Sequence, residues 1–113
     1  MVKTSSFVAL LPDGWRDLPF SHFREGVEIA QLRSADPAVA LLRYKPGASV
    51  PHHEHTGLET ILVLEGTQSD ERGDYPVGTL VLNPKGSKHS VWSDRGCTVL
   101  IQWESPVYFT GDK

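Results

Sequence analysis

The 113-residue chain contains a single cysteine, and it has no long apolar run and no large excess of charge of either sign. One cysteine excludes an intrachain disulfide and a thiolate zinc site, and we expect Cys97 to be a small apolar core residue. Apolar stretches such as AVALL are far too short to cross a bilayer, and MVKTSSFVAL lacks a secretory signal pattern. We therefore expect a cytoplasmic protein without a membrane partner. The net charge of −3 provides no attraction for nucleic acid.

Short runs rich in Val, Ile, Leu and Tyr recur between turn residues: VEIAQLR, AVALLRYK, ETILVLEG, GTLVLNP and CTVLIQWE. No window of helical length has a clean helical period, and eight prolines with ten glycines favour many tight turns. The pattern predicts one all-β domain over residues 1–113, built as a sandwich, jelly roll or small barrel. Residues 1–25 are the least strand-like, and their aromatic residues predict an N-terminal arm that packs on the barrel or on a partner subunit.

In residues 50–66, VPHHEHTGLETILVLEG, three histidines and Glu59 stand immediately ahead of an apolar run. Residues two apart in a strand point to the same face, so His53 and His55 present two imidazoles side by side. That is the arrangement required for two ligands of one metal. His52 is out of step with this pair, and we interpret it as a surface or supporting residue.

Glu59 opens the next apolar run, where it shares a strand face with Ile61 and Val63. A carboxylate on an apolar face must be compensated or protonated, and a bound cation is one such compensation. His89 follows the turn NPKGS, and it joins the group if its strand neighbours that of His53. The alternative is that the histidines lie in an exposed loop, with Glu59 solvated and His89 capping a turn.

The spacings resemble the two sequence motifs of the cupins. The first motif is matched by Gly47, His53, His55, Glu59 and Gly66, and the second by Gly78, Pro84, Gly86 and His89, with Ser93 in place of the usual asparagine. The segment LETILVLEGTQSDERGDYPVGTLVLNPKGSKHSVWSDRGCTVLIQW is similar to the ChrR-type branch. The resemblance implies a cupin double-stranded β-helix (jelly-roll) barrel, a homodimer, and a divalent metal held by His53, His55, Glu59 and His89.

The resemblance further implies a metal-binding cupin similar to the ChrR regulatory or sensory domain. Three imidazoles and one carboxylate suit Zn, Fe, Mn or Ni and do not identify the metal, and open coordination positions imply a small-molecule ligand. In that family the cupin is attached to a zinc-binding anti-sigma domain with its own histidine and cysteines. Because the 113 residues of this sequence contain Cys97 as their single cysteine, we expect no sigma factor to bind through such a zinc-binding module.

The alternative function is an Fe(II)-dependent dioxygenase that acts on a small ketone or phenolic substrate, since cupins related to this branch include such enzymes. These enzymes often use three histidines without the glutamate, so Glu59 counts against this alternative. A third reading is metal-free isomerisation, which requires a histidine base and a positioned acid instead of four converging ligands.

The residues identify no catalytic group. We interpret Trp92 and Trp103 as core residues, with the lining of the metal pocket by one of them as the less favoured alternative. We interpret the remaining acids as solvent-facing or turn residues: Glu54, Glu65, Asp70, Glu71 and Asp74.

Overall fold

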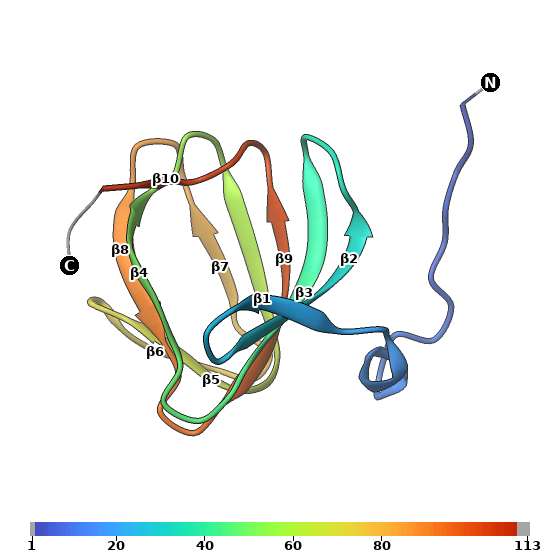
Figure 1. The fold of residues 1–113 in the computed structure, drawn as a ribbon, viewed down its shortest axis with the longest axis horizontal. Coiled ribbons are helices and arrows are strands. Elements are labelled where there is room, and N and C mark those ends of the chain that lie inside the picture. The colour runs from blue at the N-terminus through green and yellow to red at the C-terminus, as the bar shows by residue number, and fades with distance from the viewer. Residues whose placement is uncertain (1, 111–113) are drawn as a thin grey trace.

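The computed structural model describes residues 2–110, which form a curled antiparallel barrel preceded by one turn of 3-10 helix, η1 (Gly14–Asp17) (Figure 1). The strands are β1 (Ser21–Arg24), β2 (Val27–Arg33), β3 (Ala38–Tyr44), β4 (Ser49–Glu54), β5 (Glu59–Asp70), β6 (Gly73–Pro76), β7 (Leu80–Asn83), β8 (Lys88–Trp92), β9 (Cys97–Trp103) and β10 (Tyr108–Phe109). No helix in this part of the chain has the length and apolar character needed to span a membrane.

The all-β prediction is confirmed, and each of the five apolar runs contains a strand, β2, β3, β5, β7 or β9. The structure adds β1, β6 and β10, which are short and mostly exposed. Their residues carry too little apolar alternation to be recognised as strands from the sequence, because they pair at the margins of the barrel.

Strand β5 connects the two sheets of the barrel. Its first part, residues 59–66, pairs with β9 and β7, whereas residues 67–70 pair with β6 and residues 69–70 also with β8. A register shift between Val63 and Glu65 marks the bend. Gly66 follows with φ of 74°, and a side chain there would collide with the carbonyl oxygen of Gly96. The sheet order β1-β2-β3-β9-β5-β8-β4-β10 places β4 and β8 side by side.

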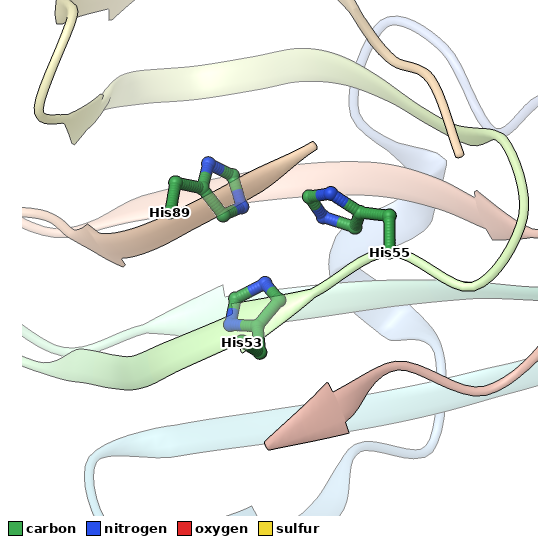
Figure 2. A group of neighbouring side chains, drawn as sticks. All are labelled: His53, His55 and His89. Carbon is green, nitrogen blue, oxygen red and sulfur yellow. The ribbon is translucent and has the colours of Figure 1, made fainter. Parts of the chain in front are cut away.

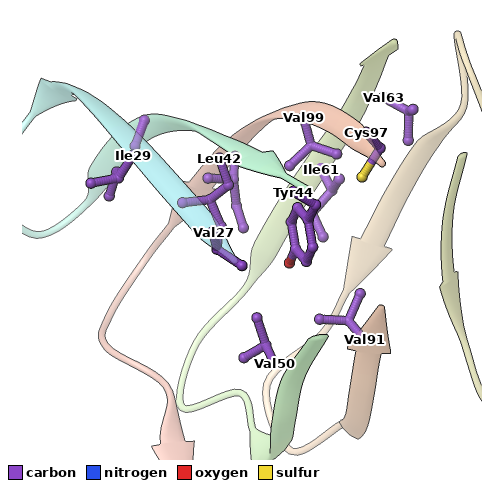
Figure 3. Packing of buried hydrophobic residues seen from close by; sticks show 12 residues of the cluster. Val27, Ile29, Leu42, Tyr44, Val50, Ile61, Val63, Val91, Cys97 and Val99 are labelled. Carbon is purple, nitrogen blue, oxygen red and sulfur yellow. The ribbon is translucent and has the colours of Figure 1, made fainter. Parts of the chain in front are cut away.

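Two apolar clusters hold the barrel together. The larger lies between the sheets and is shown in Figure 3: Val27, Ile29, Ala40, Leu42, Tyr44, Val50, Ile61, Val63, Val91, Cys97, Val99 and Ile101. Cys97 is buried there, as predicted. On the outer face of β2 and β3, the buried Trp15 packs with Ala30 and Leu41. These strands therefore bury both faces, one against the core and one against the N-terminal segment.

Candidate metal centre

Three buried histidines meet at one end of the barrel, where β4 pairs with β8 (Figure 2). His53 lies directly opposite His89 in the antiparallel register, and His55 follows β4 by one residue. The alternation of β4 places His53 and His55 on the inner side, with exposed fractions of 3% and 1%. One ligand nitrogen from each of the three imidazoles lies within 4.8 Å of the other two. This is the spacing of side chains that share one metal ion.

Glu59, at the start of β5, lies beside this group. Its Oε1 is 3.0 Å from Nε2 of His55 and 4.0 Å from Nε2 of His89. The side-chain amide of Asn83 donates to Oε1 at 3.0 Å, and the indole nitrogen of Trp103 donates to Oε2 at 2.8 Å. The structure thus brings all four sequence-predicted residues together, with the carboxylate held by two donors that the sequence did not reveal.

Backbone and hydroxyl acceptors orient two of the imidazoles. Nδ1 of His53 lies 2.8 Å from the carbonyl oxygen of Pro51. Nδ1 of His55 lies 2.8 Å from the hydroxyl and 3.1 Å from the carbonyl oxygen of Ser87. That hydroxyl donates to the carbonyl of Pro84, so it accepts from the histidine. In both rings Nδ1 therefore carries the proton, and Nε2 keeps its lone pair.

The third imidazole is oriented by Asp70. Nδ1 of His89 lies 3.0 Å from its Oδ2, and the same carboxylate accepts from the Arg72 backbone, the Arg72 guanidinium and the Tyr75 hydroxyl. Burial acts to raise the pKa of Asp70, but the hydrogen bonds from His89, Arg72 and Tyr75 outweigh it and hold the pKa below its usual value. The interpretation of Asp70 as a solvent-facing residue was wrong, because its side chain is buried against His89.

The Nε2 atoms of the histidines show whether these residues fit a metal ion. Among the described residues, Nε2 of His55 and of His89 has no hydrogen-bond partner, and the approach of Glu59 to His55 lacks hydrogen-bond geometry. Buried lone pairs without a donor are costly, and a divalent cation satisfies them. Burial lowers the pKa of His53, which favours the neutral ring that metal binding requires. Burial acts to raise the pKa of Glu59, but His55 and the other two histidines lower it by more. The pKa therefore lies below its usual value, and the carboxylate is ionised.

A narrow cavity of about 40 Å³ adjoins His53, Glu59 and His89. Such a volume holds about three water-sized molecules. The ring of Phe109, from β10, lies 5.8 Å from that of His53 and forms part of the cavity wall. Trp103 also lines the cavity, which was the less favoured alternative for the two tryptophans. A larger surface groove, about 690 Å³, lies elsewhere and includes none of the candidate ligands.

An outer vestibule of about 270 Å³ shares part of its wall with the cavity. Both are lined by Phe23, Trp103, Val107 and Phe109. The wall that the cavity and the vestibule share is therefore apolar and aromatic. His52 lies away from the cavity, and its Nδ1 is 3.1 Å from the hydroxyl of Thr110.

Comparison with known proteins agrees with this architecture. The model of the ChrR cupin-like domain family matches residues 14–105. The anti-sigma-E factor ChrR of Cereibacter sphaeroides is 34% identical over 87 residues, which are 74% of this chain and 41% of that protein. In the crystal structure of Rhodobacter sphaeroides SigE in complex with the anti-sigma ChrR, the matched chain has a TM-score of 0.71 at 29% identity, covering 77% of this chain and 50% of that one. The chain thus spans half or less of each of these relatives.

A further structural match is the acetylacetone dioxygenase of Acinetobacter johnsonii, with a TM-score of 0.80 at 16% identity over 99% of this chain and 83% of that one. Identity at this level supports the fold alone. The double-stranded β-helix barrel predicted from the sequence motifs is confirmed. Because the family model covers most of the chain, this protein belongs to the ChrR cupin-like domain family.

Proposed function

We propose that this chain is a metal-binding regulatory cupin domain in which His53, His55, Glu59 and His89 hold a divalent transition metal. The observation that carries the proposal is the orientation of the imidazoles. Each Nδ1 faces an oxygen acceptor, which leaves three Nε2 lone pairs available in one small buried volume. A metal held there supplies a Lewis-acidic centre for a small ligand, and Zn, Fe, Mn and Ni all accept this set of donors.

The surrounding residues stabilise the arrangement. Asp70 and Ser87 orient two of the imidazoles, and Asn83 and Trp103 restrict the carboxylate of Glu59. The ionised Glu59 partly neutralises a divalent ion, which lowers the cost of placing that charge inside the barrel. The apolar wall around the cavity limits the access of water.

The regulatory role rests on similarity to ChrR, whose name describes an anti-sigma factor. In this proposal, ligand or metal occupancy alters the barrel, and a separate protein or domain reads the change. The expectation that no sigma factor binds through a zinc-containing anti-sigma module stays a prediction, and so do the cytoplasmic location and the homodimer.

The decisive experiment is the metal content of purified protein, measured by elemental analysis after loading with Zn, Fe(II), Mn or Ni and dialysis. Wild type and the His52→Ala control should each retain about one metal per chain, because His52 contacts Thr110 and lies outside the cavity. His89→Ala should lose most of the metal and Glu59→Gln a large part of it. Absence of metal from the wild type, or equal retention in all variants, contradicts the proposal.

The alternative function is an Fe(II)-dependent dioxygenase for a small ketone or phenolic substrate. It is supported by the group of three mutually close histidines and by the apolar and aromatic residues that line the vestibule. Oxygen uptake by the Fe(II)-loaded protein with a diketone, a hydroxyketone or a catechol would support it. If none of these compounds increases oxygen consumption, this alternative is rejected for those substrates.

A further inference from the structure

Two polar side chains that take no part in the histidine group line the same cavity. Tyr44, from β3, and Gln68, from β5, are 4% and 2% exposed, and both share the cavity wall with His53 and His89. Figure 3 shows the Tyr44 hydroxyl directed from β3 into the space between the two sheets. Neither residue was singled out by the sequence motifs.

Tyr44 and Gln68 carry more hydrogen-bonding groups than a single contact between them uses. A hydroxyl and a carboxamide together offer three donors and several lone pairs, of which a hydrogen bond between Tyr44 and Gln68 uses one donor and one lone pair. Most of the neighbouring wall is apolar, including Leu42, Val50 and Ile61. Buried polar groups are almost always paired with protein, water or a ligand, so these two side chains favour an oxygen-containing occupant of the cavity.

The protonation of Tyr44 agrees with a donor role. Burial raises the pKa of its hydroxyl far above the ordinary value, and Cys97 and Glu59 act in the same direction. The hydroxyl therefore stays neutral and can donate a hydrogen bond to a ligand oxygen.

Charge and size restrict the ligand further. Among the described residues, no lysine or arginine lines the cavity, and Glu59 is its only carboxylate. A divalent metal beside Glu59 leaves a single net positive charge, which matches a neutral or singly negative ligand. About 40 Å³ accepts a head of only a few atoms, so any larger body must extend into the vestibule between Phe23, Trp103 and Phe109.

We infer that Tyr44 and Gln68 bind the polar head of a small ligand that enters the cavity beside the three histidines. The ligand is an oxygen-containing molecule with at most one negative charge and an apolar or aromatic body. This inference rests on the proposed metal site and adds the class of molecule that the site accepts.

The test uses the Co(II)-loaded protein, whose visible absorption reports ligand binding, and benzohydroxamate as the probe. This compound has a small oxygen-bearing head and an aromatic body. Binding should be saturable, and Tyr44→Phe and Gln68→Leu should each weaken it about tenfold, the effect expected from one lost buried hydrogen bond. Tyr108→Phe removes the same atom from a tyrosine that is 61% exposed and outside the cavity, so it should leave the affinity unchanged. The 4-carboxy derivative should bind at least tenfold more weakly, because the described residues that line the vestibule include Asp36 and no lysine or arginine.

The cobalt content of the protein distinguishes a failure of the metal site from a failure of the ligand role inferred for Tyr44 and Gln68. If the wild type retains no cobalt, the metal site itself is contradicted. If cobalt is retained but both cavity variants bind benzohydroxamate as tightly as the wild type, the inference on Tyr44 and Gln68 is overturned while the metal site stands. Circular dichroism shows whether each variant folds. If Tyr44→Phe fails to fold, the affinity of Gln68→Leu for benzohydroxamate decides whether the inference holds, and the reverse applies if Gln68→Leu fails to fold.

Discussion

The carboxylate of Asp70 and the imidazole of His89 form a buried pair, with Oδ2 and Nδ1 3.0 Å apart. Asp70 ends strand β5, and Glu59, which begins the same strand, lies on the other side of the ring at 4.0 Å from Nε2. One strand that runs through both sheets therefore supplies two carboxylates to one imidazole. This arrangement sets both the tautomer and the direction of His89.

Asp70→Asn should weaken metal binding by about 10-fold to 100-fold, the usual cost of losing a carboxylate that orients a metal-binding imidazole. The dissociation constant is measured by competition with a chromogenic chelator. Asp74→Asn is the matched control, since Asp74 accepts a hydrogen bond from Ser69 in the neighbouring β5–β6 hairpin. Similar affinities for the two variants would show that Asp70 does not support the site.

Trp103→Phe should lower metal affinity by about fivefold, because it keeps the aromatic ring but removes the indole donor to Glu59. Trp92→Phe makes the same change outside the cavity and should have no effect. The same chelator competition compares the two variants. An unchanged affinity in Trp103→Phe would mean that Asn83 alone positions the carboxylate.

The stability of the protein should fall as pH rises from about 9 to 11, in part through Cys97. Burial raises the pKa of its thiol from 9.0 to about 11. Between these values the unfolded chain releases a proton that the folded protein retains, so the free energy of unfolding decreases with pH by up to about 2–3 kcal/mol. Urea unfolding at several pH values measures the slope, which should be shallower in Cys97→Ala. Equal slopes would contradict the prediction.

Homodimer formation was expected from the cupin resemblance, and β7 offers a surface for it. Leu80 and Leu82 on this strand are each 58% exposed. If the chain dimerises through this face, Leu82→Asp should convert the dimer to a monomer, as measured by light scattering. Val77→Asp, at a position 62% exposed in the preceding turn, should leave the mass unchanged. A monomeric wild type would remove the expectation altogether.

Much of the fold and the candidate ligand set could be predicted because both depend on local regularities. The two-residue period of strands placed His53 and His55 on one face and Glu59 with Ile61, and the buried positions of the structure follow that period. The motif spacings then connected His89 to the group. Strands with strong apolar alternation were recognised for the same reason.

The supporting residues could not be predicted, because their contacts join distant parts of the chain. Asp70 lies 19 residues from His89, Asn83 lies 24 from Glu59, and Trp103 lies 44 from Glu59. Nothing in the local pattern separates Asp70 from the exposed acids around it. Only the pairing of β5 with β7, β8 and β9 brings these groups together.

By itself, the sequence determined the all-β class, the family and the four residues that meet at the site, since each depends on short-range periodicity or spacing. The tertiary structure alone decided which groups orient those residues and which side chains line the cavity. The physical reason is that strand pairing across the bend of β5 converts separations of tens of residues into hydrogen-bond distances.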